Sequence, residues 1–503
     1  MKTRVFSLIV ILVLLISTFP GCGGASETEP VSDNPGGTTA QTASQTPGGE
    51  QTPEIDSNAE DTNEPSAEDT NDPSKDEPAT LPEPVEAEPA WTEPDYSGFV
   101  MPEATGELIV YGMSGYDLAL TAAVDLFREK YPDVRVRYDM LSEDEFASRI
   151  QAEIPAGRGP DLLFTFTSVI PDPFKSMSSH IFTDLNPYFL NDTEFDWNDY
   201  LKEAADCLLY QGERQIVPVE LNLSVYKTSY ETLTEAGINQ EEIKTFEDYC
   251  AACIRYHEAC PDNALYSSGG EDDYLKELLS ASGMKFIDYN RGTASVNEEQ
   301  LHALLDVCKA FHTGSNHEID ADHKAIEGLF ERMYLCSNIG TGELSLMNAI
   351  ALIKNRGETP CLLPVTDIYG GVTAEVISFA AVPQGSANKL NAYRLLKILL
   401  SEEIQGGHEP TMGQRDYLQT GIPVMKPAIK KRTLAVKEMF FPSADENAQL
   451  IIDYCTSVTN ASLLPTNIYR YIVNDMSGYI AGNKSWEDCY KKFLNTLELY
   501  ASE

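Results

Sequence analysis

Residues 107–165 of the chain read ELIVYGMSGYDLALTAAVDLFREKYPDVRVRYDMLSEDEFASRIQAEIPAGRGPDLLFT. Short apolar or alternating runs, typical of strands, are separated here by stretches in which apolar residues recur every three to four positions, as on one face of a helix. Pro132 ends the first helical stretch, because proline cannot continue a helix. The pattern predicts strands over 108–111, 134–138 and 162–165, and helices over 120–131 and 144–154.

Strands that alternate with helices in this way form a parallel sheet with helices packed on its faces, so we expect an α/β fold. Ligands of such sheets bind beyond the carboxyl ends of the strands. The segments around the ends of the first and third strands are therefore candidate ligand loops, and they contain Met113, Ser114, Tyr116, Thr165, Phe166 and Ser168.

The N-terminus is typical of an export signal, with a basic start followed by an uncharged, mostly apolar run over 5–19. A membrane-spanning helix needs about 20 apolar residues, so this shorter run favours a signal peptide over 1–21. Gly21-Cys22 resembles the end of a bacterial lipobox, although Phe19-Pro20 replaces the usual residues before it. That resemblance implies that Cys22 is lipidated, carrying palmitate or a similar acyl chain, and anchors the chain to the lipid bilayer.

Residues 22–102 differ in composition from the rest of the chain. Between 23 and 100 there are 19 Asp and Glu against the single Lys75, and most other residues are Pro, Ser, Thr, Gly or Asn. The octapeptide AEDTNEPS at 59–66 recurs as AEDTNDPS at 67–74. So little apolar surface cannot offset the entropy of ordering the segment, and its like charges repel. We expect a disordered acidic tether.

The region after the tether, 103–503, is long enough for more than one hydrophobic core, so we expect two lobes. About −27 of the chain's net charge of −43 falls here, which argues against a nucleic-acid partner, because such partners require basic patches. Nine cysteines follow Cys22 without the spacing of a disulfide framework, so at least one thiol stays free unless chains pair.

Several short motifs occur in an order that resembles the extracellular solute-binding proteins of ABC importers, in the branch that includes maltose-binding protein. They are, in chain order, YPDVRV at 131–136, AGRGPD at 156–161, TDLNPY at 183–188, VPVELNLSVY at 217–226 and IAGNKSWED at 480–488. Each motif is weak alone, and their order and spacing over about 107–503 carry the resemblance.

The resemblance implies a type II periplasmic-binding-protein-like fold, in which two lobes with parallel-type sheets close like a hinge on a ligand. Lobe one is then about 104–221 with 362–403, and lobe two about 222–361 with 404–503. The resemblance also implies a monomer, without cofactor or catalytic activity, that delivers a small solute, most often a carbohydrate, to the permease subunits. With the lipid anchor, we expect the chain on the outer face of the cytoplasmic membrane, as in Gram-positive bacteria.

Glu220 is the strongest single candidate for ligand contact, because the family often uses the acid of this crossing motif to accept sugar hydroxyls. A solvated carboxylate at a hinge is the alternative. Asn222 is a second candidate in the same motif. Gly342 and Glu343 stand where the family has an aromatic-rich stretch, and we include them in the predicted site.

Sugar sites also need aromatic faces, and the tryptophan platform of maltodextrin-binding members is missing. Only Trp197 and Trp486 lie in the folded region, and Trp486 belongs to an apolar helical stripe that indicates a core position. Tyrosines can substitute, although each has packing as its alternative role. The candidates are Tyr116, Tyr274, Tyr369 and Tyr469.

Two motifs imitate metal sites. Cys250, Cys253, His257 and Cys260 are potential zinc ligands, yet most of them share one helical face, where cysteine behaves as a small hydrophobe. Residues 316–327 imitate a calcium loop, but Ala321 stands where that loop requires glycine. We therefore predict no metal site.

Two alternatives stay open for the function. The solute can be another polar molecule, such as a short peptide or an organic anion, although no arginine stands out in the candidate loops. The chain can also be a surface carbohydrate-active enzyme that uses paired carboxylates, which its many acidic residues neither favour nor exclude.

Overall fold

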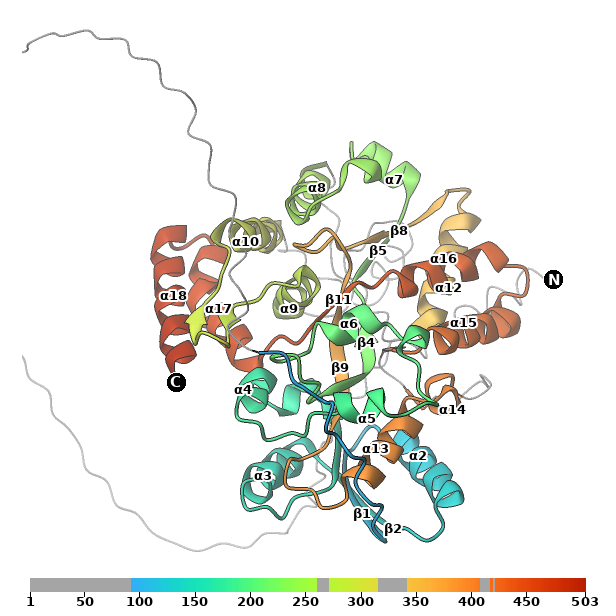
Figure 1. Cartoon of the computed structure of the whole chain (residues 1–503). Coiled ribbons are helices and arrows are strands. Elements are labelled where there is room, and N and C mark those ends of the chain that lie inside the picture. Colours follow the sequence, from blue (N-terminus) through green and yellow to red (C-terminus); the bar gives the residue numbers. More distant parts are fainter. Residues whose placement is uncertain (1–91, 260–270, 315–341, 408–416, 419–420) are drawn as a thin grey trace, which may run out of the picture. The chain divides into compact units, whose positions relative to one another are not determined.

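The computed structural model describes residues 92–259, 271–314, 342–407, 417–418 and 421–503, all within one compact unit, Pro89–Glu503 (Figure 1). The expected signal peptide, Cys22 and most of the expected tether lie outside the described residues, as do Cys260 and the motif at 316–327. Helices and strands alternate along the described chain, and the α/β fold predicted from the sequence is confirmed.

The largest sheet begins with the strands that the sequence predicts. β1 (Glu107–Met113) runs parallel to both β2 (Arg135–Leu141) and β3 (Leu162–Phe166). Segments that return from far along the chain extend the sheet. β9 (Thr373–Ala381) runs antiparallel to β3 and to β4 (Val217–Asn222), β10 (Ile422–Pro423) runs antiparallel to β4, and β11 (Asn460–Ser462) runs parallel to β9. The strand order is β10-β4-β9-β3-β1-β2.

The first two helices follow from local sequence. α2 (Asp117–Lys130) buries Leu120, Val124 and Phe127 on one face and ends before Pro132. Ser142 and Glu145 form a capping box at the start of α3 (Glu143–Glu153), in which the backbone N–H of Ser142 donates to the Glu145 carboxylate at 3.2 Å. Such a box satisfies backbone donors that the first turn of a helix leaves unpaired.

Asp161, the last residue of the AGRGPD motif, joins three parts of this sheet. Its carboxylate is 5% exposed and accepts hydrogen bonds from the backbone N–H of Ile109 (2.8 Å), the Ser386 hydroxyl (2.7 Å) and the Asn388 amide (2.9 Å). The motif therefore has a structural role, because it ties β1 to the segment that follows β9.

Two clusters of buried hydrophobic residues organise the described chain. The first surrounds the large sheet and extends to α12 (Gly342–Asn355), α15 (Lys426–Phe440) and α16 (Asp445–Thr456). The second is built on α8 (Phe246–Ala259), α9 (Glu271–Ser282), α10 (Glu298–Gly314), α17 (Thr466–Ile480) and α18 (Trp486–Ser502). Cys250, Cys253 and Trp486 are buried in the second cluster, as their helical spacing predicts.

Along the chain, the cluster changes at 225–233, 308–346, 350–361, 365–374 and 463–468, and Leu362 of β8 belongs to the first cluster although Cys361 and Leu363 belong to the second. The passages at 225–233 and 365–374 lie near the lobe boundaries that we expected at 221 and 361, whereas α12, α15 and α16, which we expected in lobe two, pack in the first cluster. Gln405, beside the third expected boundary at 403, is fully buried within the first cluster, where its amide donates to the carbonyl oxygens of Val219 and Leu399.

Shorter elements connect this framework. They are η1 (Thr167–Val169), α4 (Pro173–Ser178), α5 (Asn186–Leu190), η2 (Trp197–Asp199), α6 (Lys202–Asp206), β5 (Val225–Ser229), α7 (Tyr230–Glu235), η3 (Gln240–Glu242), β6 (Ile287–Asp288), β7 (Thr293–Ala294), β8 (Pro360–Pro364), α13 (Lys389–Leu399) and α14 (Glu402–Gln405). β5 pairs antiparallel with β8, and β6 with β7. In the part of the chain that the structure describes, no helix has both the length and the hydrophobicity needed to cross a bilayer.

Candidate functional site

The loops that follow β1 and β3 meet at the carboxyl edge of the sheet. The two strands are parallel neighbours, so their carboxyl ends lie side by side. The Tyr116 ring, just after β1, lies 4.3 Å from the Phe166 ring at the end of β3, measured between centroids. The structure thus brings together the two segments that the sequence predicts as ligand loops.

The residues of these loops differ in what they offer a ligand. Met113, Tyr116 and Thr165 are buried in the sheet and its packing, and the Tyr116 ring also lies 4.8 Å from the Phe164 ring. Three predicted residues are more accessible: Ser114 and Ser168 are exposed, and Phe166 is half-buried. Two hydroxyls beside an aromatic ring suit a ligand that has both polar and apolar faces.

Glu220 lies at the same level of the sheet as Phe166, because both residues pair with Ser378 of the intervening strand β9. Its side chain is fully buried. The carboxylate accepts a hydrogen bond from the backbone N–H of Gly421 at 3.1 Å and lies 3.4 Å from the donating Ser378 hydroxyl. The Glu220 carboxylate therefore links β4 to β9 and to the residue before β10, and Glu220 also lies near the edge of the sheet where we expect the ligand.

Asn222, two residues further along β4, is 4% exposed. Its side-chain oxygen has no hydrogen-bond partner among the residues that the structure describes. Buried polar atoms are nearly always hydrogen-bonded, so an acceptor of this kind calls for a partner. Asn222 also stands three residues before the passage between the clusters that begins at residue 225.

The other predicted residues lie elsewhere in the chain. Tyr369 is 60% exposed at the turn between β8 and β9, and its hydroxyl donates to the Gly283 carbonyl at 3.4 Å. Tyr469 is half-buried on α17. Tyr274 lies on α9, and Gly342 and Glu343 begin α12, but the side chains of these residues lie outside the described part.

A cavity of about 340 Å³ is the main feature that sequence reasoning missed. It is lined from three separate stretches, 207–211, 283–290 and 461–465, together with Phe174, Ser295 and Ile468. Of the residues predicted from the sequence, none lines this cavity as far as the structure describes the chain. No sequence signal could have revealed it, because its walls come from segments up to about 290 residues apart.

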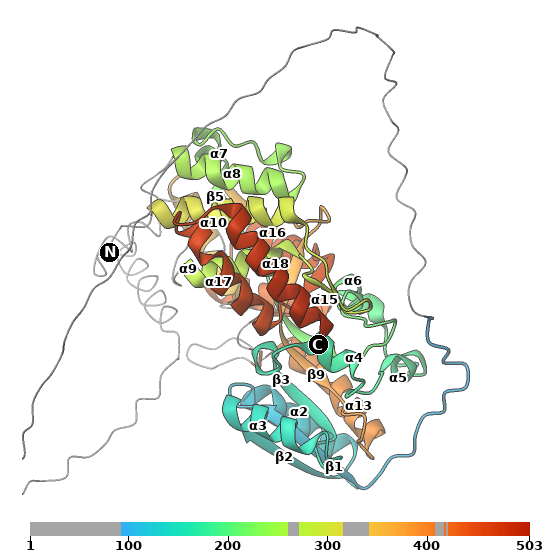
Figure 2. The same cartoon turned by 90° about the vertical axis from the view of Figure 1, so that its left-hand side faces the viewer.

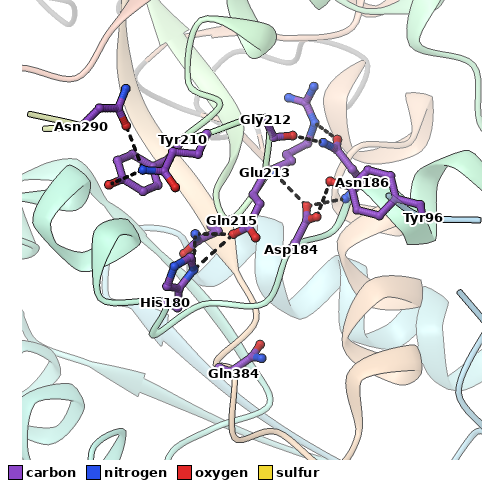
Figure 3. Close-up of polar contacts among 12 residues, drawn as sticks. Tyr96, His180, Asp184, Asn186, Tyr210, Gly212, Glu213, Gln215, Asn290 and Gln384 are labelled. Carbon is purple, nitrogen blue, oxygen red and sulfur yellow. Dashed lines mark hydrogen bonds and ion pairs between the residues drawn. The ribbon is translucent and has the colours of Figure 1, made fainter. Parts of the chain in front are cut away.

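A polar network adjoins this cavity through Tyr210 and Asn290, the two residues labelled in Figure 3 that line the cavity. The Asp184 carboxylate accepts hydrogen bonds from the Tyr96 hydroxyl and from the backbone N–H groups of Asn186 and Arg214. Burial is the largest cause that raises the pKa of Tyr96, and the neighbouring Asp184 adds to it. The Tyr96 hydroxyl therefore stays a hydrogen-bond donor, and this network fixes the chain that enters the folded region.

A second part of the network lies around Gln215, which is fully buried. Its amide donates to the Glu213 carboxylate at 2.8 Å, and His180 lies 3.3 Å from the same carboxylate. His180 and Gln211 have φ angles of 48° and 50°, a conformation that is uncommon for residues other than glycine. In the described residues, no group of three or more His, Cys, Asp or Glu side chains is placed to hold a metal ion.

Comparison with known proteins supports the reading of the fold. The sequence model of the bacterial extracellular solute-binding proteins matches residues 113–406, more than half of the chain. The arabinooligosaccharide-binding protein of Halalkalibacterium halodurans is 25% identical over 214 residues, which are 40% of this chain and 45% of that protein. This match therefore spans less than half of the relative's length.

Several solved structures share the fold. A family 1 extracellular solute-binding protein from Alicyclobacillus acidocaldarius gives a TM-score of 0.52 at 12% identity, over 80% of this chain and 100% of that one. The cyclic alpha-maltosyl-1,6-maltose-binding protein of Arthrobacter globiformis gives 0.51 at 14% identity, over 79% and 99%. A de novo designed cysteine esterase gives 0.54 at 13% identity, over 80% and 99%.

At these identities the structural likeness shows the fold alone, and the family model carries the assignment. Its match begins at Met113, at the first candidate loop, and continues through Glu220 to the end of α14. The chain belongs to the family of bacterial extracellular solute-binding proteins.

Proposed function

We propose that the chain is the substrate-binding protein of an ABC importer and captures a small carbohydrate between two lobes that close on it. It delivers the bound sugar to the permease subunits in the membrane. In this proposal it works as a monomer without a cofactor and catalyses no reaction.

The meeting of the β1 and β3 loops with Glu220 at one sheet edge carries the proposal. Parallel α/β sheets bind ligands beyond the carboxyl ends of their strands, in the crevice between the loops that leave neighbouring strands. Ser114 and Ser168 are exposed there, and Glu220 and Asn222 follow on the other side of β9. Hydroxyls, a carboxylate and an amide are groups that pair with sugar hydroxyls.

The aromatic surface supports a carbohydrate without a tryptophan platform. Trp486 is buried and stacks on His302 at 3.9 Å, and Trp197 packs against Phe189 and Phe195, so both described tryptophans have packing roles. The half-buried Phe166 ring then supplies an apolar face at the sheet edge, and Tyr369 and Tyr469 are candidates outside that edge. The named binding functions of the arabinooligosaccharide-binding and maltosyl-maltose-binding relatives favour a sugar over a peptide.

We take the two hydrophobic clusters as the cores of the two lobes. The passages at 225–233, 365–374 and 463–468 act as hinge segments, since hinge closure is absorbed by a few residues at the ends of elements. A ligand that bridges both lobes stabilises the closed arrangement by its greater affinity for it.

Attachment to the membrane completes the proposal. Lipidation of Cys22 holds the protein at the outer face of the cytoplasmic membrane, and the acidic segment up to about residue 102 gives the lobes room to reach the permease. Metabolic labelling with a palmitate analogue tests this directly: we expect the wild-type chain to be labelled and Cys22→Ser to stay unlabelled.

A thermal-unfolding screen tests the function. We expect one class of mono- or oligosaccharide to raise the midpoint, because a ligand at 100 times its dissociation constant adds about 2.7 kcal/mol of stability. Short peptides and organic anions form the comparison sets. If a member of one of these sets raises the midpoint and no saccharide does, the ligand belongs to that set and is not a sugar. Release of shorter sugars from a stabilising oligosaccharide would make the chain an enzyme.

A further inference from the structure

One buried carboxylate joins the two hydrophobic clusters. Asp172, which precedes α4 and is 6% exposed, accepts hydrogen bonds at the same oxygen, Oδ2, from the hydroxyls of Tyr289 (2.8 Å) and Tyr500 (2.7 Å). Its other oxygen accepts the backbone N–H of Lys175 at 3.0 Å and caps α4. Asp172 is therefore held rigidly on its own side while it binds two side chains from elsewhere.

Two further contacts link the same elements. The Lys175 ammonium donates to the carbonyl oxygen of Tyr500 at 2.6 Å and lies 3.7 Å from the centre of the Tyr500 ring. The Phe174 ring stacks on the Tyr289 ring at 5.1 Å. Every residue from 172 to 175 except Pro173 thus contacts Tyr289 or Tyr500 through its side chain.

The partners come from opposite sides of the boundary between the clusters. Phe174 packs against the first cluster, Tyr500 belongs to the second, and Tyr289 packs against both. Tyr289 stands at the turn of the β6–β7 hairpin, and Tyr500 is on the last turn of α18. Figures 1 and 2 both show the end of α18 beside α4.

The exposed rim of this contact is polar. Next to Tyr289, the side-chain oxygen of Asn290 accepts a hydrogen bond from the Gln211 amide at 3.0 Å, which again connects the hairpin to the first cluster (Figure 3). Gln211 and Asn290 of this rim, and Phe174 and Tyr289 of the ring stack, all line the 340 Å³ cavity. The contact therefore stands beside unfilled space at the boundary between the clusters.

We propose that Asp172 and Lys175 with Tyr289 and Tyr500 form an inter-lobe latch, which stabilises the present arrangement of the two lobes and so sets how readily they rearrange when ligand binds. The proposal rests on the two-lobe closure proposed above. A hydrogen bond to a charged group contributes more than one to a neutral group, so each tyrosine hydroxyl shifts the equilibrium between lobe arrangements by about tenfold.

The two tyrosine hydroxyls of the latch are hydrogen-bond donors at neutral pH. Burial raises the pKa of both tyrosines above the usual value, and the Asp172 carboxylate raises it further. Both hydroxyls therefore remain protonated donors, and the latch is released by the motion of the lobes.

Distance measurement between the lobes tests the latch. Labels are attached to the exposed positions Glu129 on α2 and Arg255 on α8 through ketone-bearing amino acids, because native cysteines preclude thiol chemistry. Pulsed electron spin resonance then gives the distance distribution of the unliganded full chain. Tyr289→Phe and Tyr500→Phe remove the hydroxyls and keep the rings, so both variants are expected to fold.

We expect each variant to move population into a second distance, by about tenfold relative to wild type, and the double variant to move it further. Tyr479→Phe is the matched control, since the Tyr479 hydroxyl donates to Asp306 within the second cluster alone. This control is expected to lower thermal stability and to leave the distances unchanged. Distance distributions of the folded double variant that equal those of wild type overturn the latch.

The outcome is separate from that of the proposed function. A saccharide that binds wild type while the tyrosine variants keep wild-type distances leaves the function standing and removes the latch. Variants that shift the distances of a protein that binds no saccharide support the latch and contradict the sugar. If the latch and the saccharide binding are both correct, the tyrosine variants must also change the affinity for the saccharide. The affinity rises if the ligand prefers the arrangement that the variants populate, and it falls if the ligand prefers the latched arrangement.

Discussion

Replacing Glu220 separates its structural role from its proposed role in binding. In Glu220→Ala the backbone N–H of Gly421 loses its acceptor at 3.1 Å, and the Ser378 hydroxyl loses its partner at 3.4 Å. Because the Glu220 side chain is fully buried, the freed donors do not face bulk solvent. Leaving a buried donor unsatisfied costs about 1–3 kcal/mol.

Glu220→Gln is the matched variant. The amide oxygen of glutamine can still accept the Gly421 N–H, and the side chain fills the same volume, so we expect a loss of about 1 kcal/mol or less. Urea unfolding of the purified protein measures both values. Equal stability of the alanine variant and wild type would show that the Gly421 contact contributes nothing and would refute this reasoning.

The same pair of variants reports on the ligand. A carboxylate that accepts sugar hydroxyls forms charge-assisted hydrogen bonds, and their loss in Glu220→Gln weakens binding by about tenfold or more while the fold is retained. Isothermal titration with the saccharide found by the screen measures the change. Unchanged affinity in the glutamine variant would remove Glu220 from the binding site.

Three further changes test the fold. Asp161→Ala deletes the buried acceptor of three hydrogen bonds, and we expect urea unfolding to show a loss of about 3 kcal/mol or more, with a loss below 1 kcal/mol as the contrary result. Gly283 has φ +69°, and a Cβ there would lie 2.7 Å from the Thr373 hydroxyl, whereas Gly237 has a similar φ of +67° and open space around it. Gly283→Ala should therefore lower the melting temperature more than Gly237→Ala does. Equal melting temperatures of the two variants would contradict the close approach. Burial alone would raise the pKa of Asp192, but hydrogen bonds, of which that from Lys397 is the largest, outweigh it and lower the pKa below the ordinary 3.8. The ionised carboxylate therefore stabilises the fold above pH 3.8, and this stabilisation is lost as the pH falls through the lowered pKa. Asp192→Asn should flatten this acid loss in melting curves from pH 5 to 2, and parallel curves for the two proteins would count against the pairing.

Local pattern was enough to predict the beginning of the sheet. The alternation over 107–165 predicts β1, α2, β2, α3 and β3, and their parallel pairing follows from the connections between them. The rest of the sheet could not be predicted, because β9 enters between β3 and β4 from more than 150 residues beyond β4. Nothing in the sequence near Val217 indicates that the returning strand will run antiparallel to it.

The site shows the same division between local and distant information. The loops containing Ser114 and Ser168 follow from strand ends, whereas the surroundings of Glu220 depend on Ser378 and Gly421, which lie 158 and 201 residues away. The family resemblance predicted Glu220 as a ligand contact without revealing that its side chain is fully buried. The residues of the latch carry no local pattern at all, since Asp172 and Tyr500 are separated by 328 residues.

A crystal structure of the protein with its saccharide tests the central claim most directly. We predict that the sugar lies between the two clusters at the carboxyl edge of the large sheet, in contact with Ser114 or Ser168 and with the end of β4 at Glu220 and Asn222. A sugar bound only in the 340 Å³ cavity, or on the surface of one cluster without contact to the other, would contradict the account.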